Sequence, residues 1–308
     1  MSKVLITGTS SGIGFETAIV LSRAGHTVYA TMRNPERGAA LRKVLEKEQL
    51  PISILKMDVD SDESVDAATS AVRAQTGCID VLVNNAGIER TGSIEGLAFD
   101  DFKATMETNY FGALRSIRAW LPDMRKRQSG CIINVTSVAG RIACSPLAPY
   151  TASKFALEAL SEALAQEVKP FNVRVAIVQP GIIDTAMSRR VEDVPTDAAY
   201  RQVRRFGQMF EASLEKPTPP TVVAEKILEI IESGTQKLRH PVGPDAEGFL
   251  GWRASMTDED WVEWGALPDE AWYERVSKDF GLDARSRRRP TTGASASAHF
   301  STTQQNNM

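Results

Sequence analysis

A tyrosine and a lysine four positions apart are the first residues of this sequence that could carry out chemistry. Tyr150 and Lys154 stand in the segment YTASK, at the start of an apolar, helix-like stretch. Residues four apart project from the same face of a helix. A tyrosine has a pKa of about 10 and is protonated at neutral pH, but a nearby ammonium group favours the phenolate and lowers that pKa. The pair could therefore donate or accept a proton, although many such pairs are ordinary surface features.

A glycine-rich loop near the N-terminus has the composition of a phosphate-binding turn. The apolar run at 3–7 leads directly into the sequence TGTSSGIG at 7–14, and a helical pattern follows. In that context Gly8 permits a tight turn, Gly12 lets the backbone approach a pyrophosphate, and Gly14 allows close contact between helix and strand. The unpaired N–H groups at the helix start favour the phosphate charge. We expect a dinucleotide at this loop; a purely structural turn is the alternative.

The end of the second predicted strand indicates which dinucleotide would bind. An acidic residue there, roughly 20 residues after the loop, would hydrogen-bond the ribose 2′-hydroxyl of NAD. The sequence at this place is Thr31-Met32-Arg33-Asn34, without a carboxylate. A guanidinium group can instead pair with a 2′-phosphate through two hydrogen bonds. Arg33 therefore favours NADP over NAD, the alternative being that it is an ordinary surface arginine.

The elements that would position these residues alternate regularly from residue 3 to about residue 180. Several short runs are apolar at nearly every position, which is typical of strands covered on both faces. Strand and helix in alternation predict one α/β domain, a doubly wound parallel sheet of about seven strands with helices on both faces. The predicted strands are 3–7, 27–32, 52–57, 79–85, 131–137, 173–180 and a short one near 237–242. The predicted helices are 15–25, 35–49, 62–77, 100–128, 150–168 and about 222–233.

Further motifs agree with one protein family in their order and spacing. They are Asp58-Val59 after the third predicted strand, Asn84-Asn85-Ala86-Gly87 after the fourth, Asn109 in ETNYFG, Ser137 at 13 residues before Tyr150, and Pro180-Gly181 followed by Thr185. Together with TGTSSGIG and YTASK, they resemble the short-chain dehydrogenase/reductase family and its TGxxxGxG and YxxxK motifs. The resemblance covers residues 3 to about 185 and implies a Rossmann-type fold. The segments VYATMRN and SPLAPYTASKFALEAL are loosely similar to 17β-hydroxysteroid and retinol dehydrogenase-like members.

The resemblance implies a role for each matching residue. Tyr150 would be the acid or base, Ser137 would hold the substrate oxygen, and Lys154 would also bind the nicotinamide ribose. Asn109 would anchor a water molecule that links Lys154 to solvent, and the Pro180-Gly181 loop would bind the nicotinamide carboxamide. The implied cofactor contacts are Thr7, Gly8, Ser10, Ser11, Gly12, Ile13, Gly14, Arg33, Asp58, Val59, Asn85, Ala86, Gly87, Tyr150, Lys154, Pro180, Gly181, Ile183 and Thr185.

The expected function is that of an NADP(H)-dependent oxidoreductase. It would interconvert a secondary alcohol and a carbonyl group on a fairly apolar substrate that is steroid-, retinoid- or ketone-like, with Tyr150 giving or taking the proton. The alternatives are an NAD-dependent alcohol dehydrogenase and a non-catalytic dinucleotide sensor or scaffold on the same fold. An epimerase or dehydratase of the extended branch is disfavoured, because its loop reads TGxxGxxG and Gly12-Ile13-Gly14 does not fit that spacing.

Composition argues against several other classes of protein. A formal net charge of −3 is too small to indicate a nucleic acid or an anionic membrane as a partner. The scattered Cys78, Cys131 and Cys144 and three isolated histidines indicate neither a disulfide framework nor a metal site. We find no signal-peptide pattern, and no window approaches the roughly 20 apolar residues of a transmembrane helix. We therefore expect a cytoplasmic protein that holds no metal, has no membrane span and acts on a small molecule.

The chain after Pro180 carries a looser pattern. The resemblance implies a mobile substrate lid at about 185–216, where apolar positions recur among charged ones. An aromatic extension at 245–284 holds four of the five tryptophans and would close the pocket, cover a partner subunit or pack back on its own domain. The arginine-rich, then small and polar, residues 285–308 cannot bury a core and are expected to be disordered.

One domain is therefore expected over 1–284, followed by the tail. The family resemblance also implies a homodimer or homotetramer, in which the long helices at 100–128 and 150–168 would pair between subunits.

Overall fold

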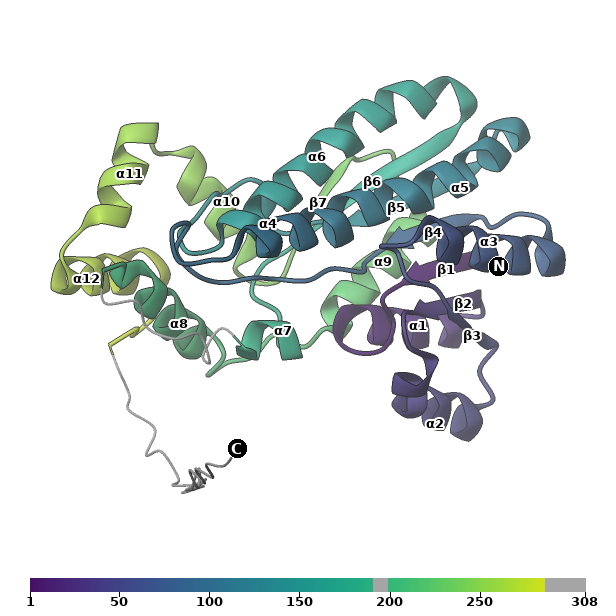
Figure 1. Cartoon of the computed structure of the whole chain (residues 1–308), viewed down its shortest axis with the longest axis horizontal. Coiled ribbons are helices and arrows are strands. Elements are labelled where there is room, and N and C mark those ends of the chain that lie inside the picture. Colours follow the sequence, from purple (N-terminus) through teal and green to yellow (C-terminus); the bar gives the residue numbers. More distant parts are fainter. Residues whose placement is uncertain (191–198, 286–308) are drawn as a thin grey trace, which may run out of the picture.

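The computed structural model of the protein describes residues 1–190 and 199–285, and Figure 1 shows a central sheet with helices packed around it. The sheet has seven parallel strands in the order β3-β2-β1-β4-β5-β6-β7. The strands are β1 (Lys3–Thr7), β2 (Thr27–Met32), β3 (Ile52–Lys56), β4 (Val81–Asn84), β5 (Gly130–Val135), β6 (Val173–Pro180) and β7 (Arg239–Val242). The doubly wound parallel sheet predicted from the alternation is confirmed.

The strand ends lie within two residues of the predicted ones. The central strands could be predicted from the sequence because both of their faces are covered. In β1, for example, Val4, Leu5 and Ile6 are all fully buried. The strand order reverses between β1 and β4, since β2 and β3 lie on one side of β1 and β4 to β7 on the other. Such a reversal leaves a crevice at the carboxyl ends of the strands, where doubly wound sheets bind their ligands.

The helices are α1 (Gly12–Arg23), α2 (Ala39–Glu48), α3 (Asp62–Thr76), α4 (Phe99–Met106), α5 (Gly112–Arg127), α6 (Ala148–Val168), α7 (Ala186–Arg189), α8 (Arg201–Ser213), α9 (Thr221–Ser233), α10 (Ala246–Ala254), α11 (Asp258–Ala266) and α12 (Asp269–Phe280). Two hydrophobic cores cover the two faces of the sheet. One contains Ile19 of α1 and Ile227 of α9. The other contains Val65 of α3, Trp120 of α5 and Leu164 of α6. Short turns lie at Pro35–Gly38, Val138–Gly140 and Lys169–Phe171.

The helix predicted over 100–128 differs from the structure in one respect. It is divided into α4 and α5 by a wide π-helical turn at Glu107–Phe111, labelled η2. A turn of this kind closes i→i+5 hydrogen bonds and is found frequently at functional sites. Thr108 and Asn109 are buried within it. Helical periodicity could not reveal the turn, because one extra residue changes the pattern too little.

Four helices gather at one end of the molecule, where α10 contacts the edge strand β7. Figure 1 shows α8 together with α10, α11 and α12 at this end, and we call these four helices the terminal lobe. Four tryptophans pack together within it, with the rings of Trp261 and Trp264 stacked at 5.4 Å and Trp252 edge-on to both. The lobe thus takes α8 from the predicted lid segment and α10 to α12 from the predicted aromatic extension.

Two parts of the predicted organisation lie outside the described residues. They are 191–198 within the expected lid and 286–308 of the expected tail. Within 1–190 and 199–285, no helix is long and apolar enough to cross a membrane.

Candidate active site

A cavity of about 1000 Å³ runs from the loop after β1, across the carboxyl ends of the strands, to the terminal lobe. Most of the predicted site residues line it. They are Gly8, Ser10, Ser11, Gly12, Ile13, Arg33, Asp58, Val59, Asn85, Ala86, Gly87, Ser137, Tyr150, Lys154, Pro180, Gly181, Ile183 and Thr185. Thr7, Gly14 and Asn109 do not, and their side chains or backbone instead hold neighbouring segments together.

Thr7 and Gly14 bring the loops after β1 and β4 into contact. The Thr7 hydroxyl accepts hydrogen bonds from the backbone N–H groups of Asn85 and Ala86, both at 3.0 Å. A Cβ atom on Gly14 would lie 2.4 Å from the carbonyl oxygen of Gly8, so only glycine fits there. Gly8 itself has a φ of +72° and approaches Ala86 so closely that a Cβ would lie 2.7 Å from its Cα. The predicted use of glycine for tight turning and close helix contact therefore applies at Gly8 and Gly14.

The backbone N–H groups at the start of α1 face the cavity without a side-chain cap. Ser11 stands at the N-cap, but its side chain makes no capping hydrogen bond. Gly12 and Ile13 in the first turn of the helix line the cavity. Backbone N–H groups and the helix dipole at such an end favour a phosphate. The site therefore fits the pyrophosphate of a dinucleotide.

Two arginines lie where the adenosine ribose of a dinucleotide would be bound. Arg33 follows β2, Arg37 lies in the short turn after it, and both line the cavity. Residues Met32 to Asn34 contain no carboxylate that could accept hydrogen bonds from ribose hydroxyls. Arg37 was not among the predicted contacts, although the motif RNPER places it four residues after Arg33. The wall opposite carries Asp58 and Val59, as predicted.

Ser137, Tyr150 and Lys154 meet at the middle of the cavity. Ser137 follows β5, and its Oγ accepts a hydrogen bond of 3.1 Å from the N–H of Ala139. Tyr150 and Lys154 lie one turn apart near the start of α6, as their spacing predicts. The Lys154 ammonium lies 5.5 Å from the centre of the Tyr150 ring and donates to the Val135 carbonyl at 2.9 Å. The three groups thus share one wall.

The predicted direction of the Tyr150 pKa is wrong for the protein alone. Burial raises the pKa of the phenol and the Glu89 carboxylate adds to this, while a hydrogen bond with Ser137 opposes them. Burial also lowers the pKa of Lys154 to about 8, against the favourable charge of Glu158. Desolvation is therefore the largest cause of the raised pKa of the phenol. Tyr150 is held in its protonated, proton-donating form at neutral pH.

Asn109 connects three elements behind this wall. Its side-chain amide donates to the Ile88 carbonyl and to the Ser153 hydroxyl, both at 2.9 Å. Its side-chain oxygen accepts the N–H of Ile88 at 2.8 Å. Ser153 directly precedes Lys154, so Asn109 ties the π-helical turn to α6 and to the loop after β4. Both N–H donors of its side-chain amide are thus used by protein groups.

Glu89 and Arg205 are among the other polar residues of the cavity that sequence reasoning missed. Glu89 lies two residues after the NNAG segment, and its Oε1 accepts a 2.8 Å hydrogen bond from Thr91. Arg205 in α8 is almost fully buried. Its neighbour Arg204 is partly exposed. Since the two residues are of the same type and differ only in packing, the sequence does not reveal which of them is buried.

The described residues contain no group of three or more His, Cys, Asp or Glu side chains that could hold a metal ion.

Known proteins resemble this chain in sequence and in fold. The sequence profile of the short chain dehydrogenase family matches residues 2–195. Retinol dehydrogenase 8 of Bos taurus is 39% identical over 250 residues, covering 77% of this chain and 80% of that protein. Estradiol 17-beta-dehydrogenase 1 of Rattus norvegicus is 34% identical over 250 residues, covering 77% and 72%. A crystal structure of a short-chain dehydrogenase from Streptomyces avermitilis superposes with a TM-score of 0.75 at 31% identity, covering 91% of this chain and 98% of that one.

Proposed function

Because this chain belongs to the short-chain dehydrogenase/reductase family of oxidoreductases, we propose that it uses NADP(H) to interconvert a secondary alcohol and a carbonyl group on an apolar substrate. One observation carries the proposal. A single cavity joins the uncapped start of α1 to the wall formed by Ser137, Tyr150 and Lys154. The cofactor and the groups that manage the proton would therefore meet at one place.

The residues present fit a dinucleotide. The first turn of α1 would hold its pyrophosphate, and Asp58 and Val59 would lie along its adenine. When bound, the cofactor supplies the hydride acceptor or donor that no protein side chain can supply. Arg33 and Arg37 support NADP over NAD, because guanidinium groups pair with a 2′-phosphate and no carboxylate competes for the ribose hydroxyls.

Tyr150 would donate its proton to the substrate oxygen in reduction and recover it in oxidation. Its raised pKa keeps the proton on the phenol at neutral pH, which favours the donor role. Ser137 would hydrogen-bond the same oxygen and hold it against Tyr150. Lys154, below its pKa of about 8, presents an ammonium that would bind the nicotinamide ribose. Asn109 fixes the backbone on which Lys154 stands.

The substrate would occupy the part of the cavity nearer the terminal lobe. Phe206, Met209 and Phe210 of α8 line it, together with the tryptophans of α10 to α12. Apolar walls of this kind support a steroid-, retinoid- or ketone-like substrate, and the lobe would act as the cover of the pocket. The names of the retinol and estradiol dehydrogenases agree with such a substrate.

The test is to follow consumption of NADPH and, separately, of NADH with a series of ketones, sterols and retinoids. We expect NADPH to be consumed with at least one carbonyl substrate, and faster than NADH. Tight NADPH binding without consumption across the series would instead favour a dinucleotide sensor or scaffold.

A further inference from the structure

The terminal lobe contributes one charged side chain to the wall of the cavity, among apolar ones. The terminal lobe contributes mainly aromatic and aliphatic side chains to the cavity wall. Among the described residues of these four helices that line the cavity, Arg205 alone is charged. Only 1% of its surface is exposed. A charge is buried in an apolar wall only at a substantial free-energy cost, unless it is paired or has a ligand to bind.

The guanidinium group of Arg205 is only partly satisfied by the protein. Its Nε donates to Asp269 at 2.7 Å and its Nη2 donates to the Leu267 carbonyl at 2.7 Å. The group lies 5.5 Å from the centre of the Trp272 ring. Nη1 is buried and makes no hydrogen bond to any part of the chain that the structure describes. Such an orphan donor is rare in a folded protein and calls for an explanation.

A second unsatisfied donor lies nearby. The indole Nε1 of Trp264 is buried and has no hydrogen-bond partner among the described residues. The Trp264 ring packs 5.8 Å from that of Trp272, the same ring that Arg205 lies against. Trp264 and Arg205 both line the cavity. Two N–H donors without acceptors therefore lie around Trp272 at this end.

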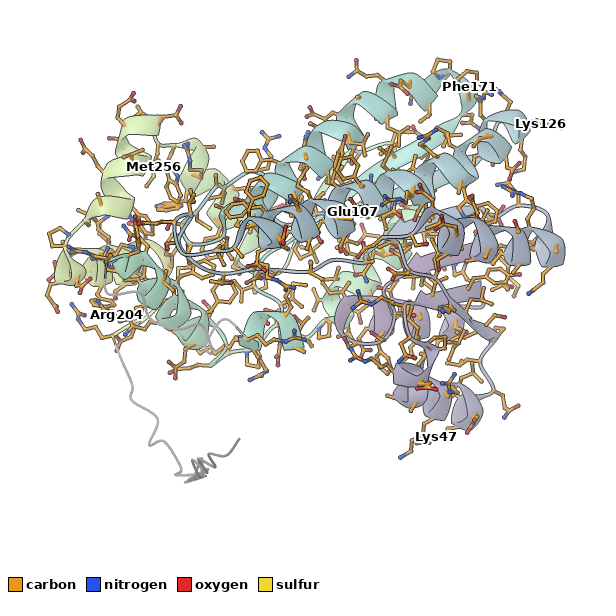
Figure 2. All side chains as sticks on the ribbon, in the orientation of Figure 1. Lys47, Glu107, Lys126, Phe171, Arg204 and Met256 are labelled. Atoms are coloured by element: carbon orange, nitrogen blue, oxygen red, sulfur yellow. The ribbon has the colours of Figure 1, made fainter. Side chains whose placement is uncertain are left out.

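At Arg205 itself, one carboxylate is shared between two arginines. Arg204 and Arg205 both bond to the single carboxylate of Asp269, at 2.6 and 2.7 Å. One negative charge thus serves two positive ones. The Arg204 side chain, labelled in Figure 2, bonds to Asp269 and Tyr273 of α12 and is partly exposed, so solvent can screen its charge. Arg205 is buried, so its charge is screened far less.

A continuous apolar surface joins this end to the proton-donating tyrosine. Met209 packs with Tyr150 and Phe206 in one hydrophobic cluster. It also packs against the cluster that contains Trp272 and Trp264. A ligand with an apolar body could therefore reach from Tyr150 to Arg205.

We propose that Arg205 and Trp264 form a binding site for a carboxylate at the far end of the substrate, so that the preferred substrate is an apolar oxo or hydroxy acid. The carboxylate would accept hydrogen bonds from Nη1 of Arg205 and Nε1 of Trp264, and its apolar body would lie along Met209. The substrate class rests on the proposed function, because it places the reacting carbonyl at Tyr150. The carboxylate site itself does not depend on turnover.

Binding of an unreactive ligand pair tests the site directly. The dissociation constants of decanoate and decanamide are measured by isothermal titration calorimetry on the protein saturated with NADPH, so that the phosphate-binding loop is filled. The wild type should bind decanoate about 10- to 100-fold more tightly than decanamide, as expected for hydrogen bonds to a charged group. Arg205→Met should remove this preference while decanamide binding changes little.

Matched variants separate a binding role from a structural one. Arg204→Met removes the adjacent arginine and its bond to Asp269 but does not touch the cavity, so the preference should change by less than about threefold. Trp264→Phe keeps the ring and removes only the N–H donor, and should reduce the preference without altering the midpoint of thermal unfolding. If Arg205→Met does not fold, the test uses Trp264→Phe and Arg205→Lys instead. Both variants should weaken the preference for decanoate over decanamide.

Three results would overturn the proposal: equal affinity of the wild type for the two ligands, an undiminished preference in the folded Arg205 and Trp264 variants, or an equal loss for both ligands. A preference for decanoate in a protein that reduces no carbonyl would leave the carboxylate site standing and reject the proposed function. Where turnover is found, kcat/KM for a methyl ketone with a terminal carboxylate should exceed that of its methyl ester, and Arg205→Met should abolish the difference.

Discussion

At the scale of single residues, the same side chains behave differently from what their types alone suggest. The tyrosine and lysine of YTASK do lie together, but burial sets their proton affinities more strongly than their mutual charge does. In the proposed reaction, the Tyr150 phenol would therefore act first as a proton donor, and as a base only when the pH rises or a ligand changes its surroundings. The proposed role of Arg33 and Arg37 in binding a 2′-phosphate likewise depends on a neighbouring feature, because the end of β2 carries no carboxylate.

The raised pKa of Tyr150 predicts different pH profiles in the two directions. Reduction needs the protonated phenol and the Lys154 ammonium, whose pKa is about 8, so kcat/KM for the carbonyl substrate should stay nearly constant from about pH 6 to about pH 7. Oxidation needs the phenolate, whose population rises about tenfold per pH unit below the pKa, so kcat/KM for the alcohol should rise through about pH 9. Initial rates in both directions check this. An oxidation rate that is already maximal at neutral pH would show that the phenol is not held protonated.

The cofactor preference should depend on Arg33. Replacing it with alanine removes a donor to the 2′-phosphate, so the dissociation constant for NADPH should rise about tenfold while that for NADH changes by less than about twofold. Cofactor fluorescence titration measures both constants. Arg23→Ala is the control, since Arg23 pairs with Glu48 on the surface and does not line the cavity. Equal losses for the two cofactors in Arg33→Ala would contradict the 2′-phosphate role.

At the scale of elements, the sheet was predictable and the terminal lobe was not. Strands such as β1 are apolar at successive positions because helices cover both faces, and this pattern is visible in the sequence. The short strand predicted near 237–242 corresponds to β7, which lies at the sheet edge beside β6. The packing of α8 against α11 and α12 depends on contacts between segments about 60 residues apart, such as Arg205 with Leu267. No local pattern encodes such contacts.

The candidate site likewise contains residues that the sequence predicted and residues that it did not. The residues at strand ends and in the glycine loop were predicted because motifs with fixed spacing carry them. Glu89, Arg37 and Arg205 were missed because their place in the cavity follows from packing alone. Asn109 was found by its motif, yet its contacts with Ile88 and Ser153 depend on the π-helical turn.

A buried ion pair joins β7 to α6 behind the candidate active site, and its loss should be measurable. Glu158 is buried and accepts bonds from Thr136, from Gln179 and, at 2.9 Å, from Nε of Arg239. Arg239→Met leaves that carboxylate without its cation, which should lower the free energy of unfolding by about 2 kcal/mol; fully buried pairs cost more, and Arg239 is partly exposed. Urea unfolding at constant pH gives the value.

The control for this pair is the second partner of Arg239. Glu162 also bonds to Arg239, but about half of its side chain is exposed. Glu162→Gln should therefore cost less than about 1 kcal/mol. Comparable losses of unfolding free energy in the two variants would mean that the burial of Glu158 does not strengthen its ion pair with Arg239.

At the scale of the whole molecule, α6 presents an apolar strip to its surroundings. Ala152, Phe155, Ala159 and Ala163 recur at helical spacing and are exposed. Phe111, at the junction of η2 and α5, is exposed as well. Such a strip is typical of an interface between subunits. It supports the expectation of a homodimer or homotetramer paired through these helices.

Phe155→Glu should accordingly dissociate the assembly. A charge placed in the strip cannot be buried unpaired, so sedimentation velocity should show a shift toward the monomer, whereas the wild type should sediment as a dimer or tetramer. Val262→Glu on α11 changes an even more exposed apolar residue away from the strip and should leave the mass unchanged. A monomeric wild type would rule out this interface.

The central claim is that Tyr150 transfers the proton in an NADP(H)-dependent reaction. Tyr150→Phe removes only the hydroxyl group, so the measurement is the rate of NADPH consumption with a reactive carbonyl substrate beside the dissociation constant for NADPH. We predict that turnover falls by about 10²- to 10⁴-fold while the dissociation constant changes by less than about threefold. Undiminished turnover in Tyr150→Phe would contradict the account.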